Sequence, residues 1–204
     1  MEKITNYKLS QFFALQDIET VDSYMSILDL LRPINHITNP KYHWFNKEPK
    51  TLPIKPVMTL SFGEVISLRK DFNNVTQQAI FEAIKLVTGL SQKSILNLRI
   101  IDFYSIISTI KQQLIDISNM EINELSPDEN QESNVDSQMV RADERMARFG
   151  ELNTINFITG KDITKWAEIQ KLPYLTVFTW LIMNKEQSAI QKDIEKLQKN
   201  RNKN

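Results

Sequence analysis

The stretch Asp102–Ser118, D-F-Y-S-I-I-S-T-I-K-Q-Q-L-I-D-I-S, decides the fold class of this chain. Its apolar side chains recur in steps of three, one, three, four and three residues, at Phe103, Ile106, Ile107, Ile110, Leu114 and Ile117. This spacing follows the period of an α-helix and gathers the six side chains on one face. Asp102 precedes them as the expected N-cap. The spacing therefore predicts an amphipathic helix over 102–118 whose stripe belongs to a core.

Helical signals dominate the rest of the chain. Ser61 and Glu64 have the three-residue separation of a capping box, and Gly89 stands where a left-handed residue would end a helix. Besides 102–118, the main helices are expected at 20–31 with Thr20 as cap, 61–72, 75–88 and 173–199. Shorter ones are expected after Ser91, over 139–149 and after Asp162. The predicted fold is mainly α, an irregular helical bundle with little or no strand.

Composition divides the chain into five segments. Residues 32–57 hold five of the seven prolines and a net charge of +4, which excludes a helix and predicts an extended arm. Residues 121–138 carry six acids and no base, which is typical of a flexible linker. Around these lie N-terminal helices over 1–31, a central helical core over 58–120 and a C-terminal helical segment over 139–204.

The proline-rich arm interleaves aromatic and basic side chains at Lys41, Tyr42, Trp44, Phe45 and Lys47. Three interpretations are open for it. It docks into a partner protein, since large aromatic residues are preferred interface anchors. Alternatively, it packs on its own domain, or its aromatics stack on a single-stranded nucleic acid. We favour docking, because the net charge of the chain is zero and an acidic run follows.

The C-terminal helix carries a second set of apolar residues. Tyr174, Val177, Phe178, Leu181 and Ile182 form a dense group that is expected to dock on the domain. The stripe is predicted to continue as Ile190, Ile194 and Leu197, while residues 192–204, with a net charge of +3, project or fray. These three residues are expected to contact another copy of the chain or another subunit.

Signals of catalysis are nearly absent. The chain has no cysteine, two histidines and four glycines, and it contains none of the common phosphate-binding, metalloprotease or serine-hydrolase motifs. His36 and His43 lack a neighbouring acidic ligand, so each is expected to hydrogen-bond a backbone group instead of a metal. We expect no enzyme activity, no cofactor and no membrane span, and a chain made in the cytosol.

Two segments carry a resemblance to a known class of proteins. Residues 60–68, L-S-F-G-E-V-I-S-L, and the Leu172-Pro173-Tyr174 helix start with Trp166 before it are similar to small helical proteins from the structural modules of tailed phages. The cysteine-free, Ile-, Lys- and Asn-rich composition resembles crAss-like phages of Bacteroides-type hosts. The resemblance implies a virion component or assembly factor that binds other virion proteins or itself. The resemblance further implies that the protein is assembled in the host cytoplasm. No catalytic residue is carried over from these proteins.

The alternative function from the residues themselves is a nucleic-acid-associated protein. It would use the basic and aromatic segment 41–47 together with the C-terminal lysines.

Overall fold

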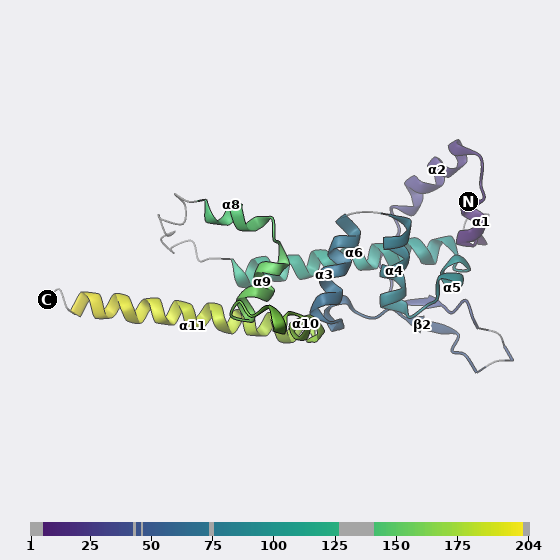
Figure 1. Ribbon diagram of the computed structural model, residues 1–204. Coiled ribbons are helices and arrows are strands. Elements are labelled where there is room, and N and C mark those ends of the chain that lie inside the picture. Colours follow the sequence, from purple (N-terminus) through teal and green to yellow (C-terminus); the bar gives the residue numbers. More distant parts are fainter. Residues whose placement is uncertain (1–5, 43, 46, 74–75, 127–140, 202–204) are drawn as a thin grey trace. The chain divides into compact units, whose positions relative to one another are not determined.

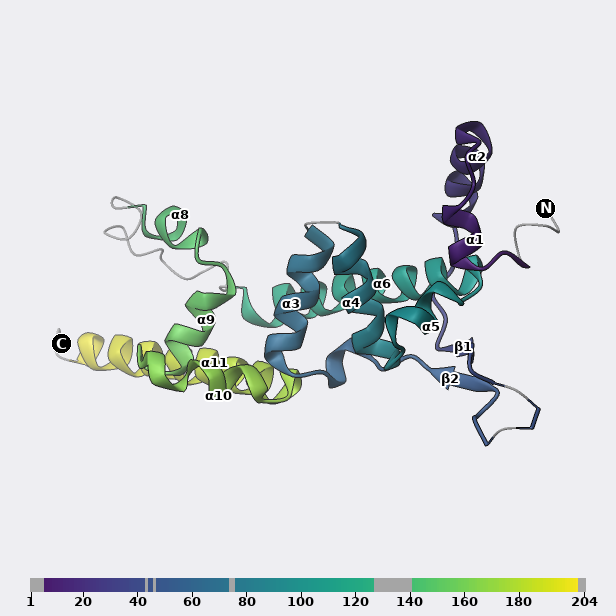
Figure 2. The same ribbon diagram turned by 45° about the vertical axis from the view of Figure 1, so that its right-hand side comes forward.

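A computed structural model describes residues 6–42, 44–45, 47–73, 76–126 and 141–201 (Figures 1 and 2). Helices predominate, and two three-residue strands make up the one sheet of the described residues, so the prediction of a mainly α fold is confirmed. The chain divides into two compact units. Unit 1 holds residues 1–60 and 67–116, and unit 2 holds residues 61–66 and 117–204.

Unit 1 is built from short elements around the first two thirds of one long helix. In chain order its elements are α1 (Leu9–Phe13), α2 (Ile18–Leu28), β1 (His36–Thr38), β2 (Thr51–Pro53), the 3-10 helix η2 (Val57–Thr59), most of α3 (Phe62–Asn73), α4 (Gln77–Thr88), α5 (Gln92–Leu96) and the start of α6 (Ile100–Leu125). Unit 2 contains the first turn of α3, the end of α6, α8 (Ala142–Ala147), α9 (Glu151–Ile158), the 3-10 helix η3 (Ile163–Lys165), α10 (Trp166–Lys171) and α11 (Tyr174–Arg201).

The apolar stripe of α6 is buried as its spacing predicts. Five of its members, Phe103, Ile106, Ile110, Leu114 and Ile117, are buried, and Ile107 is half-buried. Phe103 meets Phe81 of α4 edge to face, with 6.2 Å between ring centroids. Helix α6 is thus the central core element of unit 1.

Both predicted ends of α6 are wrong. The helix begins at Ile100, so Asp102 lies in its first turn and is not the N-cap. Its buried carboxylate instead accepts two hydrogen bonds from the guanidinium of Arg99, at 2.8 and 2.9 Å. At the other end the helix continues to Leu125, so residues 121–125 are helical and not part of a linker. The rest of the predicted linker, 127–138, lies outside the described residues.

Four of the other predicted caps are confirmed, and one is wrong. Ser61 and Glu64 form the expected capping box, Gly89 ends α4 with a φ of 71°, and Ser91 and Asp162 accept hydrogen bonds from the backbone of the turns they start. Thr20, by contrast, lies inside α2, where its hydroxyl donates to the carboxylate of the N-cap residue Asp17. The prediction of Thr20 as cap is therefore wrong.

The proline-rich segment is a hairpin whose two ends are packed on unit 1. Strands β1 and β2 pair antiparallel, with Ile37 opposite Leu52. Ile37, Ile54 and Val57 are buried, and the backbone N–H of Val57 donates to the Gln113 side chain of α6 at 2.6 Å. The ends of the segment therefore belong to the domain's own core, and only the loop between the strands projects from it (Figures 1 and 2).

Unit 2 is organised by a ladder of aromatic rings. Phe62, Tyr174 and Phe178 are stacked in sequence, with ring centroids 6.3 and 6.0 Å apart. The Tyr174 hydroxyl donates to Glu121 of α6 at 2.8 Å, and the Phe62 N–H donates to the Leu172 carbonyl at 2.8 Å. The two segments that carry the resemblance thus meet in one core.

Helix α9 was not predicted from the sequence. Its apolar residues Leu152, Ile155 and Ile158 are three apart, which is a helical spacing, but they occupy only two turns. Ile155 is fully buried in unit 2, and this burial is what stabilises so short a helix.

Candidate interaction surfaces

The loop between β1 and β2 is held at its base by Asn39. This buried asparagine donates from its side-chain amide to the Pro49 carbonyl at 2.9 Å and accepts from the Lys41 backbone N–H at 2.9 Å. Its own backbone N–H donates to the Lys50 carbonyl at 3.0 Å. The hydrogen bonds to Pro49 and Lys50 therefore join the two sides of the loop where it leaves the strands, and the one from Lys41 fixes the turn on the first side.

The tip of the loop presents aromatic side chains to solvent. Trp44 is 86% exposed and Phe45 is 73% exposed, and their rings meet edge to face with 5.8 Å between centroids. Tyr42 on the same loop is 39% exposed, and both Lys41 and Lys47 are exposed. All five residues predicted to bind a partner through the arm are thus brought together on one loop. We call this the hairpin tip.

The three predicted contact residues of the C-terminal helix lie in the other unit. Ile190, Ile194 and Leu197 are all exposed on α11. The prediction that they continue the buried group that starts at Tyr174 is wrong. Sixteen residues separate Tyr174 from Ile190, which corresponds to about 160° around the helix. The buried and the exposed apolar residues therefore occupy two different faces of α11.

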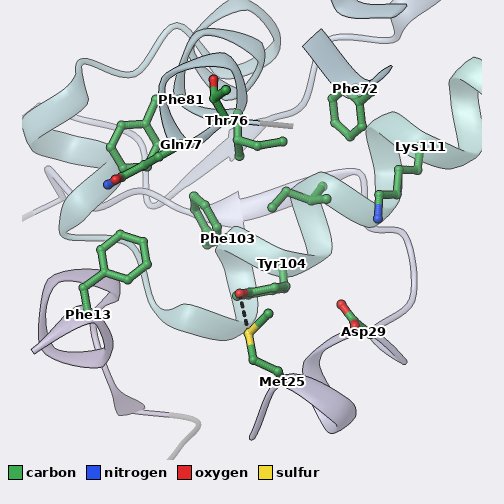
Figure 3. A pocket seen from close by; sticks show the side chains of 12 residues that line it. Phe13, Met25, Asp29, Phe72, Thr76, Gln77, Phe81, Phe103, Tyr104 and Lys111 are labelled. Carbon is green, nitrogen blue, oxygen red and sulfur yellow. Dashed lines mark hydrogen bonds between the residues drawn. The ribbon is translucent and has the colours of Figure 1, made fainter. Parts of the chain in front are cut away.

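Unit 1 also contains a pocket of about 370 Å³ that the sequence analysis did not predict. Aromatic and apolar side chains from five helices line most of it, including Phe13 of α1, Met25 of α2, Phe72 of α3, Phe81 of α4 and Phe103 of α6 (Figure 3). No spacing rule along the sequence joins residues from five separate elements, so this pocket had no sequence signal.

Five polar side chains also line the pocket, namely Asp29, Thr76, Gln77, Tyr104 and Lys111. The Tyr104 hydroxyl donates to the Met25 sulfur at 2.8 Å (Figure 3). Burial raises the pKa of Tyr104, and the negative charge of Asp29 raises it further. Tyr104 is therefore a protonated hydrogen-bond donor at neutral pH and not a base, and the pocket is suited to an apolar group.

The described residues contain neither a candidate metal site nor a candidate membrane-spanning helix. His36 is an exposed residue of β1, and His43 lies outside the part of the chain that the structure describes. Within that part, no three acidic or histidine side chains are grouped so that they could hold a metal ion. None of the described helices is both long and apolar enough to cross a membrane. Comparison of the chain with protein families, curated proteins and solved structures finds no match.

Proposed function

We propose that this chain is a non-enzymatic assembly protein that docks on a partner protein through the hairpin tip. The observation that carries the proposal is the exposure of Trp44 on a loop whose base is locked. A tryptophan ring exposed to water is an unfavourable arrangement that burial in an interface would relieve.

The locked base makes the hairpin tip an efficient anchor. Trp is among the residues most enriched at energetic hot spots of interfaces, where truncation costs about 2 kcal/mol or more. A loop already held by the hydrogen bonds of Asn39 loses less conformational entropy when it binds. Trp44 and Phe45 supply apolar area, while Lys41 and Lys47 at the rim favour an acidic partner surface. Segment 121–138 of a neighbouring copy, with a net charge of −6, has the matching charge.

The resemblance of segments 60–68 and 166–174 supports a more specific proposal. The partner is a virion protein of a tailed phage, and the chain acts in the tail, neck or cargo region of the particle. Mass spectrometry of purified particles tests this directly, because an assembly component is expected in the particle or in its assembly intermediates.

Trp44→Ala tests the hairpin tip. The isolated variant should keep its helical content and unfolding midpoint, because Trp44 is exposed and contacts little of unit 1. Its incorporation into particles, or its binding to the purified partner, should weaken by about 2 kcal/mol or more. Leu30→Ala is the matched control, since Leu30 is 80% exposed in unit 1 but lies outside the hairpin tip.

Two results would overturn the proposal. A collapse of stability in Trp44→Ala with intact association would place the aromatic side chains in the domain's own core. Loss of salt-dependent binding to a single-stranded DNA oligonucleotide, with protein association unchanged, would favour nucleic-acid binding instead.

A further inference from the structure

From Trp180 onward, the exposed apolar residues of α11 follow a heptad repeat. Counted from Trp180, the a positions are Trp180, Gln187, Ile194 and Arg201, and the d positions are Met183, Ile190 and Leu197. The steps between them alternate strictly between three and four residues, which is the spacing of a coiled-coil seam. All of the apolar members are exposed in the structure, from 39% for Trp180 to 60% for Leu197.

Trp180, at the start of the register, meets Phe157 of α9 edge to face, with 5.7 Å between ring centroids, so the uncovered part of the seam begins at Met183. The face of α11 that is buried in unit 2 is a different one. Its buried residues Tyr174, Val177 and Phe178 occupy the b, e and f positions of the same heptad register. Lys185, also an f residue, donates to the Glu124 carbonyl at the end of α6 at 2.9 Å. Position f lies opposite the a/d seam on a helix. Packing within the unit therefore leaves the seam uncovered over the second half of α11, which runs on past α9 and α10 (Figure 2).

We propose that this seam binds the same seam of a second copy, forming a parallel two-stranded coiled coil over Met183–Arg201. The segment is about 28 Å long. Ile194 at a followed by Leu197 at d is the combination that favours two strands. Lys185, Lys192 and Lys199 all fall at f, where they point away from the seam.

The charges beside the seam select a parallel arrangement. The g positions hold Glu186 and Asp193, and the following e positions hold Gln191 and Gln198. In a parallel pair each g residue faces an e residue of the partner, so each carboxylate meets an amide that can donate to it. In an antiparallel pair g residues face g residues, and carboxylates would face each other. Gln191 donates one N–H to Glu195 within its own helix at 3.2 Å, which leaves its second N–H for the partner copy.

Polar residues at a set the register of the pair. Gln187 lies between Met183 and Ile190, and in a parallel in-register dimer it meets its own counterpart, so the two amides can hydrogen-bond. A shift by one heptad would place Gln187 against Ile194 and leave the amide without a partner in the seam. Polar a residues of this kind reduce stability but specify alignment.

Sedimentation of the full-length protein tests the pairing. The unchanged chain should show a concentration-dependent monomer–dimer equilibrium. Leu197→Ser should raise the dimer dissociation constant at least tenfold, because it removes a d residue from the seam. Lys199→Ser is the matched control: it introduces the same residue two positions away at f and should leave the dissociation constant unchanged. A chain that stays monomeric up to high micromolar concentration, or equal effects of the two variants, would overturn the proposal.

Orientation is tested by a single cysteine, since the chain has none of its own. Arg201→Cys places a thiol at the last a position of the seam. In a parallel in-register dimer the two introduced thiols are adjacent, so mild oxidation should cross-link most of the protein. Dimers of this variant that do not cross-link would overturn the parallel arrangement. Trp44→Ala should leave dimerisation intact, so failure of this pairing and failure of the hairpin-tip proposal are distinguishable.

Discussion

Gly63 stands where α3 and α10 pack closely against each other in unit 2. A Cβ atom at this position would lie 3.0 Å from the Cβ of Gln170 and 3.1 Å from its backbone carbonyl oxygen. A carbonyl oxygen of the main chain cannot rotate away as the end of a side chain can. The glycine of the S-F-G-E segment is thus explained by close helix packing, because its backbone is ordinary helix.

Gly63→Ala should therefore destabilise the protein. Alanine favours a helix over glycine by about 1 kcal/mol, whereas overpacking costs typically about 1–3 kcal/mol, so a net loss of about 1 kcal/mol is expected in urea unfolding. Ser67→Ala is the control, since Ser67 is an exposed residue of the same helix. If Gly63→Ala were as stable as Ser67→Ala, α10 would have room to move away.

Tyr104 should titrate above the ordinary tyrosine range. Burial and the charge of Asp29 raise its pKa, so the folded state keeps the proton at a pH where the unfolded state has lost it. The contribution of Tyr104 to the free energy of unfolding is therefore fully present below a pH of about 10, and it decreases as the pH rises further. Absorbance at 295 nm, with Tyr104→Phe to identify the signal, measures this pKa. Asp29→Asn should lower it partly, because burial is the larger cause, and an unchanged pKa would contradict the role of Asp29.

At the scale of an element, α6 shows how far a spacing rule reaches. Its stripe was predicted from steps of three and four residues, and burial confirms it. The start of its first turn was predicted wrongly, because Asp102 is a common N-cap residue type but lies inside the helix. The partner of the Asp102 carboxylate is Arg99, which also donates to the Thr38 hydroxyl of β1 at 3.2 Å. That second contact joins residues 61 positions apart.

Ile110 and Ile115 give a matched test of the stripe on one helix. Ile110 is fully buried, and Ile110→Ala should lower the free energy of unfolding by about 2–5 kcal/mol. Ile110→Asp should prevent folding, because it buries a carboxylate without a partner. Ile115 is 53% exposed in the same unit, so Ile115→Asp should give a folded, soluble protein by circular dichroism. A cooperatively folded Ile110→Asp variant would show that the stripe is not core.

At the scale of the whole molecule, α3 and α6 contribute residues to both compact units. Each unit carries one of the two proposed interaction surfaces, the hairpin tip in unit 1 and the α11 seam in unit 2. The two proposals together predict a chain that dimerises through unit 2 and docks through unit 1. Bivalent engagement of this kind strengthens binding without new contacts, which is consistent with the proposed role in assembly.

The sequence by itself determined most of the helices and several of their ends. The caps at Ser61, Gly89, Ser91 and Asp162 depend on hydrogen bonds or backbone geometry within about four residues, so they can be read locally. The stripe of α6 and the exposed aromatics of the hairpin tip were predicted for the same reason. Both depend on the type and spacing of neighbouring side chains.

Only the tertiary structure decided which parts of these elements are covered. The Thr109 hydroxyl of α6 pairs with both the N–H and the carbonyl of Ile34, 75 residues earlier, and such contacts separate the packed ends of the proline-rich segment from its projecting tip. The two faces of α11 were likewise distinguished by burial against residues far away in the chain. Burial depends on partners that sequence spacing does not identify, and for that reason it had to come from the folded molecule.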